Sequence, residues 1–304
     1  MPLIFFGTST FAVPALRALA GDVVLVVSQP DRPGRRGMRL QATPVKEAAL
    51  ELGLPVEAPE KSRSPEFVER LESLEADALV VAAYGQILSQ RVLDSAKRGG
   101  INLHGSILPK YRGAAPIQRC ILDGETETGV TLMQMDRGMD TGDMIEIGRL
   151  AIGPDETYGE LQDRLAILGA EMAVRWMPRI VAGNYPRTPQ DSEQATMAPK
   201  IEKAEAELRF DRDAAAEYNR FRAFTPSPGA FLQTRFGVIR IGQARLHGEV
   251  QAEPGTLVAT DRRLVVAFAQ GGLELLEIQP EGKKRMRGSD FTNGARLRPG
   301  DRLH

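Results

Sequence analysis

Short apolar runs alternate with longer amphipathic stretches through the first half of the chain. The runs at residues 3–6, 23–27, 78–82 and 101–103 are predicted to be buried strands, and the stretches at residues 13–20, 45–52, 66–74 and 117–122 are predicted to be helices. Alternation of strands with helices indicates a parallel sheet that is covered on both faces. Ligands of such sheets bind beyond the carboxyl ends of the strands, so functional residues are expected there.

The pattern changes in the second half of the first domain. Residues 130–134 and 143–150 are predicted to form a hairpin at the edge of the sheet, followed by a helix over residues 158–182. Between residues 185 and 203, prolines and glutamines replace large apolar residues, which is typical of a linker. The first domain is therefore expected to end before this stretch.

The remainder of the chain has a different character. A short helix is predicted at residues 214–223, followed by short strands at residues 230–234, 238–245, 255–259, 263–268 and 273–279. Short strands with regular turns indicate a small closed sheet. The predicted fold is α/β, with a parallel-rich, Rossmann-like sheet and flanking helices, followed by a smaller C-terminal β-barrel (OB-like) domain. The predicted boundaries are residues 1–188 for the first domain, 189–204 for the linker and 205–304 for the second domain.

Charge and cysteine content narrow the classes of protein. The formal net charge of −1 over 304 residues excludes a uniformly basic nucleic-acid coat, but residues 200–304 carry 18 Lys and Arg against 14 Asp and Glu. Contacts with a polyanion would therefore come from local patches. Cys120 is the only cysteine, which excludes an intrachain disulfide or a cysteine metal cluster and favours a cytoplasmic setting. The apolar runs are shorter than the ~20 residues of a membrane span, so no membrane partner is expected.

The most informative stretch leaves a predicted strand at Ile101 and enters a loop punctuated by glycine and proline. Because side chains alternate along a strand, Asn102 and His104 are expected on the same side. An asparagine amide can donate to a carbonyl oxygen that becomes negative, and histidine moves protons near neutral pH. The pair suits acyl transfer, although an isolated histidine at a strand end more often has only a structural role.

A glycine-containing loop with three acids follows the first strand of the predicted hairpin. Asp140 is expected to reach the imidazole of His104 and to hold its orientation. Asp136 and Asp143 are expected instead to cap the turn through their side chains. The sequence therefore predicts a trio of Asn102, His104 and Asp140. The three histidines of the chain show no metal-ligand spacing, so no metal is expected.

Several motifs together resemble a known family. Three segments resemble the core signature of folate-dependent formyltransferases: Asn-Leu-His-Gly-Ser-Ile-Leu-Pro at residues 102–109, Arg-Gly at residues 112–113 and Gly-Met-Asp-Thr-Gly-Asp at residues 138–143. Three further segments resemble methionyl-tRNA formyltransferases, namely residues 6–14, 29–33 and 282–284. The resemblance therefore spans nearly the whole chain.

The resemblance implies a reaction and a set of site residues. It implies 10-formyltetrahydrofolate as donor, initiator methionyl-tRNA as acceptor, and Asn102, His104 and Asp140 as the catalytic residues. It also implies a folate-binding wall that consists of Tyr84, Gly85, Gln86, Ile87, Leu88, Ser106, Ile107, Leu108 and Pro109. The first domain would then be catalytic, the second would bind tRNA, and the protein is expected to be a monomer.

Basic residues are the candidates for contacts with tRNA. Residues 32–39 contain four arginines and no acid, which suits contacts with phosphates and bases, although a solvated basic loop is the generic alternative. The candidates are Arg35, Arg36 and Arg39 in this loop, and Lys200, Lys203, Lys283, Lys284 and Arg285 towards the C-terminus. Arg36 is the first choice for a single contact.

Three alternatives stay open. The first two are a formyltransferase that acts on an amino sugar nucleotide and a formyltetrahydrofolate hydrolase, both of which resemble this chain but usually belong to longer chains with another catalytic module. The third is an inactive RNA-binding module, which the intact trio of Asn102, His104 and Asp140 argues against.

Overall fold

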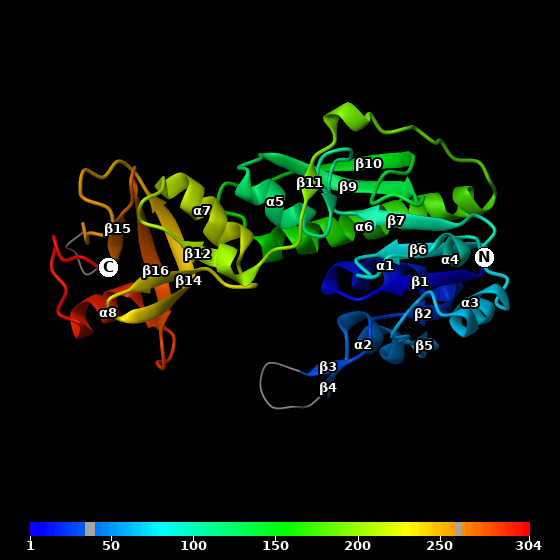
Figure 1. The fold of residues 1–304 in the computed structure, drawn as a ribbon, viewed down its shortest axis with the longest axis horizontal. Helices are drawn as coiled ribbons and strands as arrows, with labels where there is room; N and C mark the ends of the chain where they lie inside the picture. Colours follow the sequence, from blue (N-terminus) through cyan, green and yellow to red (C-terminus); the bar gives the residue numbers. More distant parts are fainter. Residues whose placement is uncertain (34–39, 259–262) are drawn as a thin grey trace. The chain divides into compact units, whose positions relative to one another are not determined.

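The computed structural model describes residues 1–33, 40–258 and 263–304, and Figure 1 shows the course of the chain. These residues form two units. The first unit comprises Met1–Pro116, Glu127–Ala151 and Gln162–Pro199, and the second unit comprises Ile117–Thr126, Ile152–Leu161 and Lys200–His304. Two short segments that precede residue 162 therefore belong to the same unit as the C-terminal part of the chain.

The first unit is built on a seven-stranded sheet in the order β10-β9-β7-β6-β1-β2-β5. Its strands are β1 (Leu3–Gly7), β2 (Val23–Val27), β5 (Val56–Glu57), β6 (Ala78–Ala82), β7 (Gly100–His104), β9 (Glu127–Gln134) and β10 (Met144–Ala151). Neighbours from β5 to β7 are parallel, whereas β9 is antiparallel to β7 and β10 is antiparallel to β9. The parallel-rich sheet predicted from the apolar runs is confirmed, and the predicted hairpin lies at its edge.

Helices follow the strands, and all but the four-residue helix at Gln90–Leu93 lie at the positions that the amphipathic pattern indicates. They are α1 (Val13–Leu19), α2 (Pro44–Glu51), α3 (Pro65–Glu72), α4 (Gln90–Leu93), α5 (Pro116–Leu122) and α6 (Tyr158–Val181). Two of them begin with a capping side chain followed by proline, since Thr43 accepts a hydrogen bond from the N–H of Lys46 at 3.1 Å and Ser64 accepts one from Phe67 at 3.4 Å. No helix in the described part of the chain is both long and apolar enough to cross a bilayer.

Different helices cover the two faces of the sheet. On one face, Ile4 and Leu79 of the sheet belong to a buried cluster with Phe67 of α3. On the other face, α6 packs closely enough that a Cβ on Gly169 would lie within about 4 Å of Leu103. Side chains alternate along β7, so the neighbours of Leu103 on that strand face away from α6.

The second unit contains a sheet in the order β12-β13-β14-β16-β15, with β17 paired to β16. Its strands are β12 (Glu207–Leu208), β13 (Phe231–Thr234), β14 (Gly237–His247), β15 (Val265–Ala267), β16 (Gly272–Pro280) and β17 (Met286–Arg287), and its helices are α7 (Ala214–Ala223) and α8 (Gly288–Gly294). Leu232, Leu275 and Ile278 of the sheet form a buried core with Phe221 of α7 and Phe291 of α8. The predicted C-terminal sheet domain is confirmed.

One predicted strand of this unit has a different structure. Thr256 and Leu257 form isolated bridges, with Arg302 and Val266, instead of a continuous strand. The turn at Pro254 and Gly255 precedes them, and Gly255 has a φ of +79°, which breaks extended geometry just where the strand was expected to begin.

The first unit also contains two pairs of very short strands. The pair β3 (Arg32–Pro33) and β4 (Leu40–Gln41) is antiparallel, and β8 (Arg112–Gly113) is parallel to β11 (Met197–Ala198). The second pair matters for the site, because it ties the segment before residue 200 to the loop that follows β7.

Candidate active site

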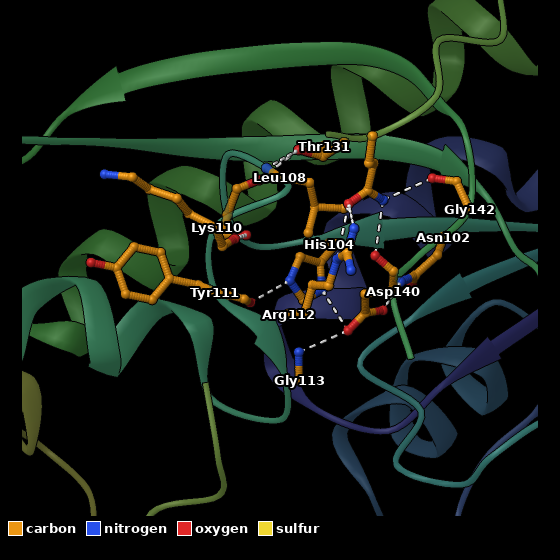
Figure 2. Close-up of polar contacts among 12 residues, drawn as sticks. Asn102, His104, Leu108, Lys110, Tyr111, Arg112, Gly113, Thr131, Asp140 and Gly142 are labelled. Carbon is orange, nitrogen blue, oxygen red and sulfur yellow. Dashed lines mark hydrogen bonds and ion pairs between the residues drawn. The ribbon is translucent and has the colours of Figure 1, made fainter. Parts of the chain in front are cut away.

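Two polar side chains lie at the carboxyl end of β7, as the alternation of the strand predicts. Asn102 and His104 are only 9% and 6% exposed, and the strand that carries them lies between β6 and β9. Their neighbour Leu103 is on the face covered by α6, so both polar side chains face the other side (Figure 2). Buried polar groups need partners, and both residues find one in the same carboxylate.

That carboxylate belongs to Asp140, in the loop between β9 and β10. Asn102 Nδ2 donates a hydrogen bond to Asp140 Oδ1 at 3.3 Å, and His104 Nδ1 lies 3.6 Å from Asp140 Oδ2 (Figure 2). The backbone N–H of Gly113 donates to the same Oδ2 at 2.9 Å. The structure therefore brings together the three residues that the sequence predicts, and it adds a backbone donor that fixes the carboxylate.

A backbone carbonyl determines which nitrogen of His104 carries a proton. His104 Nε2 lies 2.9 Å from the carbonyl oxygen of Tyr111. A carbonyl oxygen only accepts, so Nε2 donates and must keep its proton. The nitrogen that can gain or lose a proton is therefore Nδ1, which faces Asp140.

The side chain of Thr131 binds two backbone groups of the loop after β7. Thr131 Oγ1 donates to the carbonyl oxygen of Ser106 at 2.7 Å and accepts from the N–H of Leu108 at 3.1 Å. Ser106 and Leu108 are buried, whereas Ile107 and Pro109 are partly exposed. Of the folate candidates in this loop, the last two therefore have accessible surface.

The second folate candidate segment, residues 84–88, follows β6. Tyr84 and Leu88 are buried in the core, and the ring of Tyr84 packs edge-on against Phe6 with centroids 5.2 Å apart. Gly85 and Ile87 are exposed, the latter by 83%, and Gln86 Oε1 accepts a hydrogen bond from the N–H of Ser62 at 3.0 Å. The exposed part of the segment is therefore limited to residues 85–87.

The Tyr84 hydroxyl has an unusual environment. Burial raises the pKa of Tyr84 to about 12. Within the described residues, neither the Tyr84 hydroxyl nor that of Ser62 has a partner in hydrogen-bond geometry. A buried hydroxyl without a partner costs stability.

The other two acids of the Asp140 loop have different partners. Asp136 Oδ1 accepts hydrogen bonds from the N–H of Gly138 at 2.9 Å and from the hydroxyl of Thr141 at 2.7 Å. Asp143 forms an ion pair with Arg187 at 3.0 Å. Asp136 therefore caps the turn as predicted, whereas the Asp143 side chain joins the loop to Arg187 instead of capping it.

The basic candidates are spread over three segments. Arg35, Arg36 and Arg39 lie outside the described residues. Lys200 and Lys203 are exposed at the start of the last segment of the second unit. Lys283, Lys284 and Arg285 are exposed in the turn between β16 and β17, where Arg285 also forms an ion pair with Glu277 at 3.1 Å.

Sequence reasoning missed two side chains that adjoin the trio. The polar composition of residues 185–203 indicates a linker, yet Gln190 within it donates to the backbone carbonyls of Asp140 and Gly142. Gln190 also accepts two hydrogen bonds from the buried guanidinium of Arg112. A glutamine among prolines and serines carries no sequence signal for such contacts, so only the structure reveals them.

The geometry favours acyl transfer. The Asn102 amide has a second N–H beyond the one directed at Asp140, and His104 can present a proton at Nδ1. Together they can stabilise an oxyanion and move a proton, which are the two requirements of a tetrahedral intermediate. Among the described residues, His, Cys, Asp and Glu side chains do not gather in threes as a metal site requires.

Family comparisons agree with this chemistry. The sequence model of the family described as formyl transferase matches residues 4–179, and that of the formyl transferase C-terminal domain matches residues 200–296. The class of protein is thus a two-domain formyl transferase.

Full-length relatives make the family more specific. A methionyl-tRNA formyltransferase from Symbiobacterium thermophilum is 48% identical, and the match covers 100% of this chain and 95% of that relative. A methionyl-tRNA formyltransferase from Myxococcus xanthus is 46% identical, with 98% and 96% covered. The chain belongs to the methionyl-tRNA formyltransferase family.

Solved structures of lower identity share the fold. The N-formyltransferase from Helicobacter canadensis, in complex with folinic acid and dTDP-3-aminofucose, aligns with a TM-score of 0.66 at 18% identity, covering 90% of this chain and 98% of that chain. HypX from Aquifex aeolicus, in complex with tetrahydrofolic acid, aligns with a TM-score of 0.64 at 15% identity, covering 95% of this chain and 46% of that one.

Proposed function

We propose that this chain transfers the formyl group of 10-formyltetrahydrofolate to the α-amino group of initiator methionyl-tRNA, in the cytoplasm where charged tRNA is used. The observation that carries the proposal is the meeting of Asn102, His104 and Asp140 at the end of β7, in a chain whose full-length relatives are named methionyl-tRNA formyltransferases. Acyl transfer to an amine requires a donor to the oxyanion and a group that moves protons, and this trio offers both.

In the proposed reaction, the free amine attacks the formyl carbon, and the carbonyl electron pair moves onto the oxygen. The second N–H of Asn102 and the Nδ1 proton of His104 stabilise that oxygen. The C=O bond then re-forms and the bond to N10 of the folate breaks. The Nδ1 proton of His104 passes to N10 as this bond breaks, and Nδ1 then takes the proton that the attacking amine releases, while Asp140 orients the imidazole.

The folate donor is proposed to lie against the accessible parts of two loops. Those parts are Gly85, Gln86, Ile87, Ile107 and Pro109. The remaining folate candidates, Tyr84, Leu88, Ser106 and Leu108, are buried and would act from beneath by shaping these loops. Four of these five residues are small or apolar, which suits the planar ring of a folate.

The tRNA is proposed to be held by the basic residues, since contacts with phosphates position RNA without reading its sequence. Arg36 is proposed to contact the acceptor end, with Arg35 and Arg39 beside it. Exposed Lys200, Lys203, Lys283, Lys284 and Arg285 would add phosphate contacts along the tRNA.

One assay tests the function. The protein is incubated with 10-formyltetrahydrofolate labelled in the formyl group and with charged initiator tRNA, uncharged initiator tRNA or no acceptor. We expect the label on the amino group of methionyl-tRNA alone. Label released as formate at the same rate in all three reactions would indicate a hydrolase instead, and transfer only to an added amino sugar nucleotide would indicate the other small-molecule activity.

A further inference from the structure

One glutamine side chain joins two loops of the site. Gln190 Nε2 donates to the carbonyl oxygens of Asp140 at 2.9 Å and Gly142 at 2.8 Å. Its Oε1 accepts from Arg112 Nε at 3.0 Å and from a terminal guanidinium nitrogen of Arg112 at 2.8 Å. All the hydrogen-bonding groups of one partly buried amide are thus directed at the backbone around Asp140 and at the side chain of Arg112.

The chemistry of these contacts requires an amide. The two carbonyl oxygens need a donor, whereas the guanidinium of Arg112 has only donors and needs an acceptor. Glutamate has the same shape as glutamine but only accepts when ionised, so it satisfies Arg112 and repels the two carbonyls. Alanine satisfies neither. The two halves of the contact can therefore be separated by substitution.

Gln190 contacts the backbone at a residue with an unfavourable conformation. Asp140 has a φ of +54°, in the left-handed region that residues other than glycine adopt sparingly. This conformation directs the carboxylate towards Asn102 and His104. Bonds from Gln190 to the carbonyls of Asp140 and Gly142 bracket the turn and hold it in this conformation.

The segment that carries Gln190 is itself tied to the loop after β7. The N–H of Tyr111 donates to Thr196 Oγ1 at 2.9 Å, and the N–H of Arg112 donates to the carbonyl of Thr196 at 2.8 Å. The carbonyl of that same Tyr111 fixes the proton on His104 Nε2. Residues 190–198 thus contact both the loop that orients His104 and the loop that carries Asp140.

We propose that Gln190 is a positioning residue for the reaction, which sets the carboxylate of Asp140 against the imidazole of His104. The inference rests on the proposed function, because the reaction in question is formyl transfer. Its effect is exerted through Asp140 and not through contact with either substrate. Misplacement of a reacting group by about 1 Å can lower a rate by about 10²-fold.

The first test compares formylation of methionyl-tRNA by the unmodified protein, Gln190→Glu, Gln190→Ala and Gln194→Ala. Gln194 is the matched control, since it is an exposed glutamine of the same segment that bonds only to Asp191 at 2.8 Å among the described contacts. We expect kcat to fall about tenfold or more for both Gln190 variants, with little change in KM for the donor, and to stay unchanged for Gln194→Ala. Unchanged kcat for Gln190→Glu would overturn the proposal, because that variant keeps the link to Arg112.

The second test does not depend on activity. The chain has only three histidines, His104, His247 and His304, so three imidazole Cε1–H signals are expected in the NMR spectrum, and the His104→Gln variant identifies that of His104. We expect Gln190→Glu to move the His104 signal while those of His247 and His304 stay in place, and Gln194→Ala to move none. An unmoved His104 signal would contradict the positioning role.

The two tests also separate this inference from the proposed function. If the unmodified protein fails to formylate methionyl-tRNA, the proposed function is wrong, and the NMR comparison still decides whether Gln190 orders the His104 site. If the unmodified protein is active and a folded Gln190→Glu variant is equally active, the function stands and the role of Gln190 is wrong.

Discussion

Asp140 Oδ2 lies 3.6 Å from His104 Nδ1, and it does so while it accepts a hydrogen bond from the backbone N–H of Gly113 at 2.9 Å. The distance is longer than a hydrogen bond, and the carboxylate attracts the imidazole electrostatically when Nδ1 carries a proton. Catalytic contacts often shorten when substrate binds. The contact from Gly113 keeps the carboxylate in place until then.

The Asp140→Asn variant tests this orientation. Both carboxylate oxygens accept from N–H donors, and an amide can accept at only one of them, so one contact is lost. We expect kcat for methionyl-tRNA to fall roughly 10²-fold, with little change in folate affinity. Asp143→Asn is the control, because that acid of the same loop pairs with Arg187. Loss of folate binding with a normal rate at saturation would assign Asp140 to the pocket instead.

Asn102 is expected to act on the transition state. Asn102→Ala removes the amide donor, and we expect kcat to fall roughly 10²- to 10³-fold with the KM of the donor nearly unchanged, as for the loss of a donor to an oxyanion. Asn102→Asp keeps the shape but places a second carboxylate where the amide lies 3.3 Å from Asp140, so it should be no more active. A folded Asn102→Ala variant within threefold of normal would remove Asn102 from the reaction.

Tyr84 gives a prediction on stability. Because its buried hydroxyl has no partner within the described residues, Tyr84→Phe should leave the free energy of unfolding unchanged or raise it by up to about 1 kcal/mol at neutral pH. Tyr185→Phe is the contrasting control and should lose about 1 kcal/mol, since the Tyr185 hydroxyl donates to Gln134 at 2.9 Å. Denaturant unfolding of the two variants measures both effects.

The raised pKa of Tyr84 also predicts that stability depends on pH. The folded pKa of Tyr84 is about 12, above the ordinary value of 10.0, so the folded state holds the phenol proton more tightly than the unfolded state. The raised pKa therefore has no effect on the free energy of unfolding below pH 10, and it lowers this free energy as the pH rises from 10 to 12. Tyr84→Phe should therefore lose less stability over that range than the unmodified protein. Equal losses of stability in the variant and the unmodified protein would show that Tyr84 does not titrate in this way.

Much of the first unit follows from the sequence because its strands are short apolar runs. Residues 23–27 and 78–82 were predicted as strands and are β2 and β6 with the same bounds. By contrast, α4 has four residues and α8 consists of Gly288–Gly294, with two glycines and no aliphatic face. Neither has the length or composition from which helical periodicity can be recognised.

The trio was predictable because alternation along a strand places Asn102 and His104 on one side. The contacts that hold the trio in place were not predictable. The contact between His104 Nε2 and the carbonyl of Tyr111, and that between Gln190 and the carbonyl of Asp140, both depend on backbone atoms, which are the same in every residue. Sequence patterns identify reacting side chains, whereas the loops that hold them require tertiary structure.

Arg36 lies outside the described residues, and its role is tested by function. Arg36→Ala should impair formylation of methionyl-tRNA while folate binding persists. If the arginine contacts a phosphate, the slope of log K for tRNA against log salt should become smaller by roughly one unit or slightly less. A contact with a base would weaken binding without that change in slope. Unchanged kinetics at every salt concentration would exclude a role for Arg36.

His104 is proposed to transfer the proton during formylation of methionyl-tRNA, and a single-turnover measurement follows that step. The unmodified protein and His104→Ala are each saturated with labelled 10-formyltetrahydrofolate, mixed with methionyl-tRNA, and the appearance of label on the α-amine is followed. We expect His104→Ala to transfer the label roughly 10²- to 10⁴-fold more slowly, as for loss of a general acid–base group, with normal thermal unfolding. A folded His104→Ala variant that transfers the label at a near-normal rate would show that His104 does not transfer the proton.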